Sequence, residues 1–331
     1  MAENTITGLV PEIFEALDIV SRELTGMIPS ATLNASANSA QVGQAIRVDV
    51  EPVGNVSNIT PAMVVPDPTG QTSGFTDIII TKSRAAEFGF NGEDQLGLNT
   101  GAGYGSVRAN KIAQAIRAVT NEVEADLCGL QSTFSRAVGT AGTTPFGTAN
   151  DYTDASKALQ VLKDNGSPLQ DNQLVINTNA GVNMLGKQAN VSDAGSDSIL
   201  RQGVLLDVNG MPIRESAQVN TVAAVGTTAN AVTTAGHAVG STSIVLKAGG
   251  SGTILAGDVI TFAGDTNQYV VVTGVGAVSG ATIVIAAPGL RQALPVGDKA
   301  ISIVAASARN MAFNRSAIVL AARAPARPVE G

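Results

Sequence analysis

The sequence predicts an α+β fold in which an α/β domain is interrupted by a separate β domain. Apolar residues recur at spacings of three and four over 9–25 and 106–136, as in amphipathic helices. Apolar and polar residues alternate over 45–50, as in a half-buried strand. From 218 to 308, short valine-rich runs are separated by glycine-rich turns, which predicts an all-β domain.

Residues 1–40 are expected to form an N-terminal helical arm. Pro11 suits the first turn of a helix, and Gly26 and Pro29 stop it. The apolar face of this helix comprises Val10, Ile13, Phe14, Leu17, Val20 and Leu24. One terminal helix cannot bury such a face by itself, so it must dock on its own domain or on a neighbouring copy. Phe14 and Leu17 are therefore candidate inter-subunit contacts.

Residues 41–92 are expected to form an extended two-stranded loop. The predicted strands are 45–50 and 78–83, and the stretch between them is rich in proline and glycine. Proline cannot donate to a backbone ladder, so the middle is an edge or an open loop. Loops this long are uncommon inside compact domains, so we expect this one to project and contact a partner.

Residues 93–150 contain the strongest predicted helix, over 106–136. It would be about 45 Å long, which exceeds the interior of a small domain. Its apolar positions are Ile112, Ile116, Val119, Val123, Leu127, Leu130 and Phe134.

The charges of this helix are arranged against its dipole. The bases lie in the N-terminal half and the acids in the C-terminal half, whereas the dipole favours the reverse order. The six residues are Arg108, Lys111, Arg117, Glu122, Glu124 and Asp126, and none has an opposite charge three or four positions on. Either solvent screens them, or they pair with charges on other elements or neighbouring subunits. On the second hypothesis, reversing the sign of Glu122 and Glu124 weakens assembly and leaves the subunit folded.

Residues 151–217 and 309–331 are expected to form the central α/β domain. Its first predicted helix is capped by Asp154 and ends at Asn165-Gly166, and a second helix is predicted at 181–189. Strands are predicted at 174–177 and, returning to the same sheet, at 317–320. The pair Asn209-Gly210 predicts a hairpin turn between 200–207 and 211–215. Because this pattern resumes after residue 308, the β domain at 218–308 is inserted into the chain.

The inserted domain is predicted as a small β-barrel, with a sandwich as the alternative. Its strands are expected at 243–246, 259–262, 269–272 and 282–285. Its charged residues are few, namely Lys247, Asp258, Asp265, Arg291, Asp298 and Lys299.

Composition argues against several classes of protein. The 331 residues carry a net charge of −7, which gives no global basic surface for nucleic acid. One cysteine cannot form an intrachain disulfide, and one histidine cannot build a multi-histidine metal site. We find no secretory signal at the start and no apolar run of about 20 residues that could span a membrane.

The candidate residues for catalysis or ligand binding are isolated from one another. The glycine-rich run at 101–105 lacks the G-x-G-x-x-G spacing of a dinucleotide site and is interpreted as a flexible joint. His237 lies in a loop of small residues without a neighbouring carboxylate, and Cys128 lies near the apolar face of the long helix. We therefore predict no enzyme activity, no cofactor and no metal site.

The order of these parts resembles the major capsid protein of tailed bacteriophages, the Hong Kong 97-type fold. It is most similar to the coat-protein family of short-tailed lambdoid phages, which carry an inserted β domain. The segments behind the resemblance are Gly-Asp-Val-Ile-Thr-Phe-Ala-Gly at 257–264, Asn-Met-Ala-Phe at 310–313 and Ala-Ile-Val-Leu at 317–320. The resemblance implies an icosahedral shell around double-stranded DNA. Residues 41–92 would reach over a neighbour, and 93–150 would form the long spine helix, at 106–136, and the peripheral domain.

The resemblance also implies the partners and the location. The chain would assemble with itself as pentamers and hexamers, around a scaffolding protein, with a portal and a decoration protein. It would enclose DNA without sequence-specific binding, make no membrane contact, and pass from the host cytoplasm into the virion. A nanocompartment shell of the same fold and a bacterial surface β protein are the alternatives. Closed particles in electron micrographs would favour a shell, and monomers under all conditions would contradict it.

Overall fold

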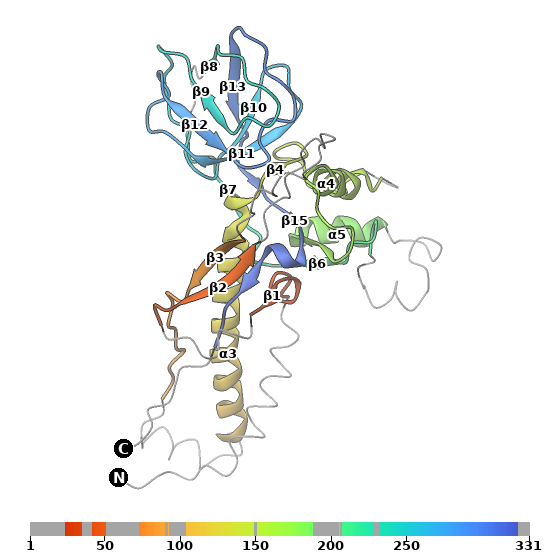
Figure 1. The fold of residues 1–331 in the computed structure, drawn as a ribbon. Helices are drawn as coiled ribbons and strands as arrows, with labels where there is room; N and C mark the ends of the chain where they lie inside the picture. The colour runs from red at the N-terminus through yellow and green to blue at the C-terminus, as the bar shows by residue number, and fades with distance from the viewer. Residues whose placement is uncertain are drawn as a thin grey trace, which may run out of the picture. The chain divides into compact units, whose positions relative to one another are not determined.

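The computed structural model describes residues 24–34, 42–50, 73–89, 92, 104–148, 151–187, 205, 207–227 and 232–323. The chain, drawn as a ribbon in Figure 1, divides by its internal contacts into two compact units. Unit 1 comprises Met1–Ala31 and Ala86–Ala317, and unit 2 comprises Thr32–Ala85 and Ile318–Gly331. Helices and several separate sheets occur together, so the predicted α+β class is confirmed.

Unit 1 contains three α-helices among its described residues. They are α3 (Tyr104–Gly129), α4 (Thr153–Asp164) and α5 (Thr178–Lys187), and the short 3-10 turns are η1 (Ile28–Ser30), η3 (Leu130–Thr133) and η4 (Arg315–Ala317). The helix predicted over 106–136 is present but ends at Gly129, giving it a length of about 39 Å. The Ser132 and Thr133 hydroxyls donate to the Gly129 and Leu130 carbonyls, a local alternative to further helix.

A three-stranded sheet forms the middle of unit 1, in the order β15-β5-β6. Its strands are β5 (Asn172–Ile176), β6 (Ile213–Glu215) and β15 (Met311–Asn314). β5 is buried throughout, antiparallel to β15 and parallel to β6. The core beside this sheet comprises Phe146, Ala155, Leu174, Ile176, Ala180, Met184, Met211 and Ile213. The strand predicted at 174–177 is therefore confirmed as the centre of the sheet.

Asp154 is not the N-cap of α4, which corrects the prediction. The helix begins at Thr153, and the Asp151 carboxylate accepts the Thr153 N–H at 2.8 Å. Asp154 instead accepts the Phe146 N–H at 2.8 Å and so fixes the preceding loop. The predicted end at Asn165-Gly166 is confirmed, because Gly166 has a φ of +78° after the helix.

The next two elements also differ from their predicted bounds. α5 begins at Thr178 rather than 181, because the Asn177 side chain accepts the Ala180 N–H at 3.0 Å. The turn at Asn209-Gly210 is confirmed, with φ angles of 56° and 73°. The strand that follows it, however, pairs with β5, and most of 200–207 lies outside the described residues.

The inserted segment contributes six strands to a seven-stranded sheet, in the order β8-β13-β10-β11-β12-β9 with β4 added beside β11. The strands are β4 (Arg136–Ala137), β8 (Val232–Thr233), β9 (Ser243–Val245), β10 (Val259–Phe262), β11 (Gln268–Thr273), β12 (Thr282–Ile285) and β13 (Lys299–Ile303). The four strands predicted from the valine-rich runs are confirmed. Among the described residues no ladder joins β8 to β9, although the Thr233 hydroxyl donates to the Val245 carbonyl at 2.7 Å. Closure into a barrel stays a prediction.

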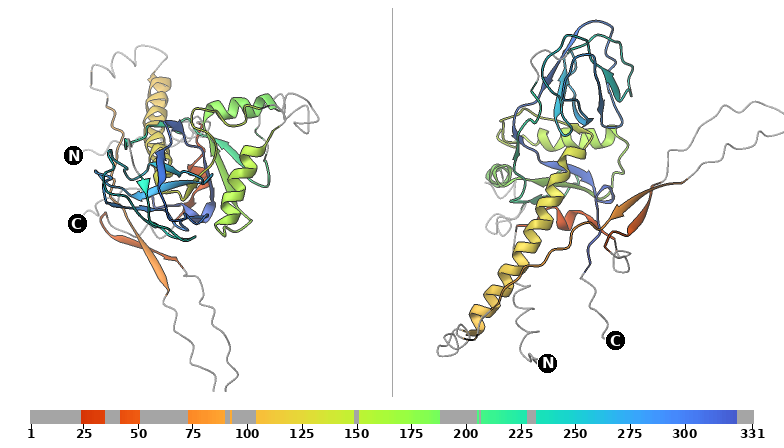
Figure 2. Two further views of the ribbon diagram at one scale, coloured as in Figure 1. Left: turned by 90° about the horizontal axis from the view of Figure 1, so that it is seen from above. Right: turned by 90° about the vertical axis from the view of Figure 1, so that its left-hand side faces the viewer.

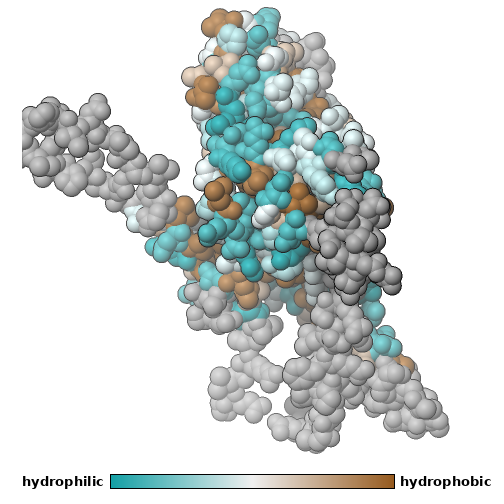
Figure 3. Space-filling model, turned by 90° about the vertical axis from the view of Figure 1, so that its right-hand side faces the viewer, coloured by the Kyte–Doolittle hydropathy of each residue, from teal (hydrophilic) through white to brown (hydrophobic). Residues whose placement is uncertain are grey.

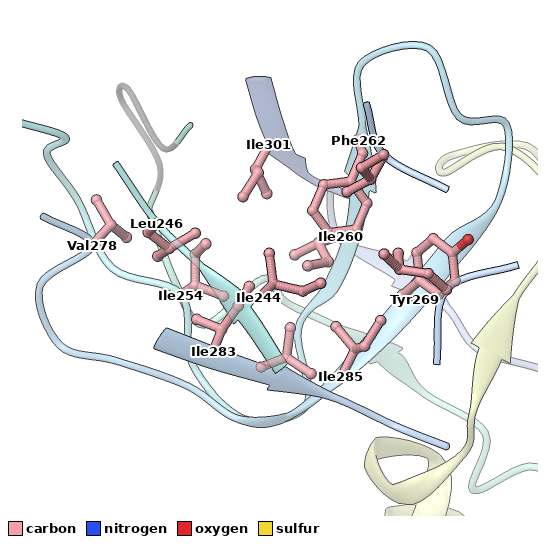
Figure 4. Packing of buried hydrophobic residues seen from close by; sticks show 13 residues of the cluster. Ile244, Leu246, Ile254, Ile260, Phe262, Tyr269, Val278, Ile283, Ile285 and Ile301 are labelled. Carbon is pink, nitrogen blue, oxygen red and sulfur yellow. The ribbon is translucent and has the colours of Figure 1, made fainter. Parts of the chain in front are cut away.

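Inward-facing side chains from all the longer strands of this sheet form one core (Figure 4). Ile244, Ile260, Ile283 and Ile285 are almost fully buried. Phe262 packs against Tyr269, with ring centroids 5.8 Å apart. The Tyr269 hydroxyl donates to Asp265 at 2.7 Å and accepts the Arg291 N–H at 3.0 Å, which satisfies the one polar atom that the tyrosine brings into the core.

The structure explains why glycines and an aspartate occur in the segment Gly257–Gly264. Gly257 and Gly264 lie on either side of β10 with φ angles of +88° and +89°, a region that favours glycine. Between them, the fully buried Asp258 carboxylate accepts the N–H groups of Val225, Gly226 and Leu255 at 2.8, 3.0 and 2.8 Å. The motif therefore anchors the loop that leads into the inserted sheet.

Among its described residues, unit 2 contains two short strand pairs. β2 (Ala45–Val50) and β3 (Gly74–Ile79) run antiparallel as a ribbon (Figure 2), and β1 (Thr32–Leu33) runs parallel to β16 (Val319–Leu320). The strand at 45–50 is confirmed. The strand predicted at 78–83 lies earlier, at Gly74–Ile79, because those residues are the ones in register with β2.

The strand that returns to the α/β sheet is also reassigned. Residues 317–320 were expected there, but β15 at Met311–Asn314 occupies that place beside β5. Val319 and Leu320 pair with Thr32 and Leu33 in unit 2 instead. The two apolar segments on either side of η4 therefore belong to different units, β15 to unit 1 and β16 to unit 2.

Candidate assembly interface

The charged side chains of α3 do not share one environment. Lys111, Arg117 and Asp126 are exposed and Glu122 is half-buried, whereas the side chain of Arg108 lies outside the described residues. Arg117, Glu122 and Asp126 each take part in an interaction within the chain. The helix has no acidic residue in its first turn and no basic residue in its last turn, so its dipole is not complemented at either end.

Glu124 is fully buried and forms hydrogen bonds within unit 1. One carboxylate oxygen accepts the N–H groups of Gly26 and Met27 at 2.7 Å each, and the other accepts the Ile28 N–H at 2.9 Å. Three consecutive backbone donors thus converge on one carboxylate, as at an anion-binding turn. Glu124 fixes the segment that follows the predicted helix at 9–25, within the predicted N-terminal arm.

Gly26 allows that segment to approach the central sheet. A Cβ on Gly26 would lie 2.8 Å from the Glu215 carbonyl oxygen and 2.9 Å from a Val175 methyl group. The Ser30 hydroxyl closes the turn by donating to the Gly26 carbonyl at 2.6 Å, and Arg214 donates to the Ser30 hydroxyl at 3.1 Å. Residues 26–30 therefore join α3 to the β5–β6 edge.

This geometry corrects the prediction for Glu124. Its carboxylate is occupied inside the chain, so we remove Glu124 from the candidate inter-subunit contacts. A lysine at this position would place a cation against three N–H donors, and loss of assembly would then report a damaged subunit. Sign reversal remains a test of assembly at Glu122, whose side chain is half-buried.

Burial shifts the pKa values of two ionisable groups near this junction, Cys128 and Glu215. Burial raises the pKa of the Cys128 thiol to about 11, with a smaller opposing effect of its contact with the Ser216 hydroxyl, so the thiol is protonated at neutral pH. Burial also raises the pKa of the Glu215 carboxyl above its ordinary value of 4.5. The fold therefore disfavours the charged form of Glu215.

The Glu215 shift predicts a pH dependence of stability. A carboxyl with a higher pKa in the folded state binds more protons there than in the unfolded chain, so the free energy of unfolding falls as pH rises through that window. The window begins at the ordinary value of 4.5 and extends upward to the folded pKa. Glu215→Gln removes this contribution. Denaturant unfolding from acid to neutral pH should show the wild type losing stability relative to the variant, and parallel profiles would contradict the assignment.

The ribbon of unit 2 exposes apolar side chains on both faces. Val50, Phe75 and Ile79 are 51%, 53% and 51% exposed. On one face, the Arg47 guanidinium lies 3.5 Å from the centre of the Phe75 ring and its Nε lies 3.3 Å from Asp77. The other face carries Ile46, Val48, Val50, Thr76 and Ile78, and no charge. A two-stranded ribbon of this kind is marginally stable in water by itself.

The base of the ribbon has a small core of its own. Buried Ile46 packs with Ile80 and Ala321, and the Gly43 N–H donates to the Ile80 carbonyl at 3.1 Å. Ala321 follows β16 directly, so residues far apart in the sequence meet here. Burial then decreases along the uncharged face, from Ile46 at 5% exposed to Val50 at 51%.

Sequence reasoning did not identify Arg47, Phe75 and Asp77. Arg47 and Asp77 occupy directly opposed positions and carry opposite charges, which is a recognisable cross-strand signal once the register is known. Because the second strand was expected at 78–83, later than its observed position, the opposition of Arg47 and Asp77 was not recognised. Phe14 and Leu17 lie outside the described residues, as does most of the glycine-rich run at 101–105.

The described residues contain no further obvious chemical centre. No group of three His, Cys, Asp or Glu side chains among them could hold a metal ion, and no helix among them is long and apolar enough to cross a membrane. His237 accepts or donates a hydrogen bond at 3.2 Å with Thr233, and burial lowers its pKa. On the face shown in Figure 3, hydrophobic side chains are scattered among hydrophilic ones.

Comparison with known proteins gives similarities of fold at low identity. No family model matches the sequence, and no curated protein matches it. A chain from a structure of Mycobacterium phage Che8 is 14% identical, with 88% of this chain and 91% of that chain covered and a TM-score of 0.45. A chain of the cyanophage P-SCSP1u capsid is 12% identical, with 86% of each chain covered and a TM-score of 0.36. A chain of the mature capsid of bacteriophage PhiM1 is 11% identical, with 87% and 86% covered and a TM-score of 0.40. TM-scores and identities this low assign neither a family nor a function.

Proposed function

We propose that this protein is the major capsid protein of a tailed bacteriophage and that its copies assemble into an icosahedral shell around double-stranded DNA. The proposed fold is the Hong Kong 97-type, in the form with an inserted β domain that short-tailed lambdoid phages use. Pentamers and hexamers of the chain are the proposed building blocks, and α3 is the proposed spine helix.

The exposed ribbon is the observation that carries this proposal. Its strands leave a small core at Ile46 and present Val50, Phe75 and Ile79 to solvent. Burying apolar side chains is favourable by roughly 25 cal/mol for each Å² removed from water. A neighbouring copy that covers the ribbon would supply this burial, and repetition of the contact by symmetry would give a closed assembly.

The surface charges support the same proposal. Lys111 and Arg117 lie toward the start of α3, with Glu122 and Asp126 toward its end. Two copies that place opposite halves of α3 near each other would attract. We therefore keep Arg108, Lys111, Arg117, Glu122 and Asp126, with the arm residues Phe14 and Leu17, as proposed inter-subunit contacts.

The remaining partners follow from the role of a shell. A scaffolding protein, a portal and a decoration protein are the proposed protein partners, with assembly in the host cytoplasm and a final place in the virion. The net charge of −7 suits a container that confines DNA without gripping its phosphates. Catalysis is not part of the proposed role.

Electron microscopy of the expressed protein tests the proposal. The full chain is imaged by negative stain, with and without a scaffolding protein co-expressed. Uniform closed shells support the capsid role. Monodisperse monomers under every condition would overturn it.

One substitution on the ribbon is predicted to separate assembly from folding. Val50→Asp places a charge on the uncharged face, where burial against a neighbour would cost several kcal/mol for each copy, about 3 kcal/mol or more. We expect shells to disappear while the unfolding curve of the subunit is unchanged, since Val50 is already half-exposed. Val296→Asp is the matched control, because Val296 is an exposed valine of the inserted domain. Normal shells from Val50→Asp would exclude the ribbon as a contact.

A further inference from the structure

The inserted domain is connected covalently to the rest of unit 1 by a narrow neck. The chain enters through β7 (Thr221–Val222) and leaves through β14 (Ser307–Ala308), and these strands pair with each other over two residues each. A neck of this size holds the two crossing chains side by side but permits bending and twisting. A fixed orientation of the inserted domain therefore requires contacts outside this neck.

A polar cluster beside the neck supplies such contacts. Asp164, at the end of α4, lies 3.4 Å from Nη1 of Arg136 and 3.9 Å from Nη2 of Arg291. Arg136 precedes the insertion and also donates to the Asn267 side chain, whereas Arg291 and Asn267 belong to two different loops of the insertion. We call Arg136, Asp164, Asn267 and Arg291 the Asp164 cluster. Its members come from α4, β4 and the inserted domain.

Arg136 is well placed to act as the centre of this cluster. Its side chain is only 7% exposed, while those of Asp164 and Arg291 are 32% and 36% exposed. A buried arginine that loses its carboxylate partner is left as an uncompensated charge, which is costly. The ion pair with Asp164 is therefore a strong constraint on where Arg136 can lie.

Backbone pairing ties the same region to the inserted sheet. β4 pairs with the first half of β11, where Arg136 is opposite Tyr269 and Ala137 is opposite Gln268. The Val270 N–H donates to the Ser135 carbonyl at 3.3 Å, and the Gln268 side chain donates to the Gly139 carbonyl at 2.6 Å. A displacement of Arg136 would thus pull on β11, which lies between β10 and β12 in the inserted sheet.

We infer that the Asp164 cluster holds the inserted β domain in one orientation against α4 in the free subunit, before any neighbour contacts it. Asp164 is the positioning residue, because it lies on α4 and pairs with Arg136 of β4, a strand of the seven-stranded sheet, and with Arg291 of the insertion. Its loss leaves the domain attached by the β7–β14 neck, the short β4 ladder, the packing of η3 on β11 and the hydrogen bond that Arg309 donates to the Gly257 carbonyl. The domain then samples several orientations, while its own core, which is centred on Ile260 and Tyr269, stays intact.

Distance measurement between two spin labels tests this inference. Labels are placed in the full chain at Val245→Cys in the inserted domain and at Lys157→Cys on α4, in a Cys128→Ala background. Both sites are exposed. The parent protein should give one narrow distance peak, and Asp164→Asn should lose that peak in favour of a broad distribution. Asp298→Asn is the matched control, because Asp298 pairs with Lys247 at 2.7 Å inside the inserted domain, and its peak should stay narrow.

The distance is measured on the unassembled subunit, and each outcome either supports or overturns the inference. A folded Asp164→Asn subunit that keeps the narrow peak overturns the inference. If Asp164→Asn fails to fold by circular dichroism, Arg291→Gln is measured instead, since Arg291 is partly exposed, and the same criterion applies. The measurement requires no assembly, so failure of the capsid proposal would leave this result unaffected.

Discussion

Replacement of Glu124 by glutamine is expected to lower the free energy of unfolding of the subunit by about 4 kcal/mol. The carboxylate accepts three N–H groups in a fully buried site. A glutamine amide has one acceptor oxygen, so its NH₂ group would face a backbone donor. Urea unfolding followed by circular dichroism measures the loss, and hydrogen exchange at Gly26, Met27 and Ile28 should show the same amides losing protection.

Asp126→Asn is the control for this experiment. Asp126 lies on the same helix two residues later and is exposed, so its neutralisation should change the free energy of unfolding by less than about 1 kcal/mol. Equal effects of the two substitutions, or continued protection of the three amides in Glu124→Gln, would contradict the role assigned to Glu124.

Asp258→Asn is expected to destabilise the protein by about 3 kcal/mol, for a related reason. Asp258 accepts the N–H groups of Val225, Gly226 and Leu255, and one of these would face the asparagine NH₂ group. Gly226 cannot move aside freely, because a Cβ there would lie 2.5 Å from the Thr253 carbonyl oxygen. We expect the inserted domain to unfold first, with Val225 and Gly226 losing amide protection before β5 does.

The corresponding control is again inside the inserted domain. Asp298→Asn removes an exposed carboxylate from the Lys247 ion pair, and it should leave the unfolding midpoint almost unchanged because solvent screens an exposed pair. If Asp258→Asn unfolds at the same denaturant concentration as Asp298→Asn, the three hydrogen bonds do not contribute as proposed.

Elements with a strong local pattern could be predicted from the sequence. The alternation at Ala45–Val50 and the run Val259–Phe262 gave the strand bounds directly, because side chains on a strand point to opposite faces in turn. The body of α3 follows from its apolar spacing. Gly166 and the pair Asn209-Gly210 were recognisable because each requires a positive φ, which few other residues adopt.

Features that depend on distant partners could not be predicted in this way. Glu124 looked like an exposed charge because its three donors lie almost a hundred residues earlier in the chain. Asp258 likewise meets donors from Val225 and Gly226, which lie more than thirty residues earlier in the loop that leads into the inserted sheet. The parallel pairing of β1 with β16 has no local signal at all, since each strand contains two residues.

Dependence on partners far away in the sequence also explains the errors in strand assignment. Residues 78–83 are as β-prone as 74–79, and only pairing with β2 selects between them. The apolar segments at 311–314 and 317–320 could each have returned to β5, and the hydrogen-bonded ladder decides for the first. Register and partner choice are properties of the folded chain, whereas propensity is a property of the segment.

The pairing of β1 with β16 has a consequence for how the protein is made. Leu33 emerges from the ribosome long before Leu320, yet each needs the other for its backbone hydrogen bonds. Domains generally fold as they are translated, so the α/β sheet and the inserted sheet can form while the chain is still growing. The base of the ribbon, where Ala321 packs with Ile46, can therefore close only after residue 321 has been translated. A chain released before residue 319 would lack β16 and would leave β1 without its partner strand.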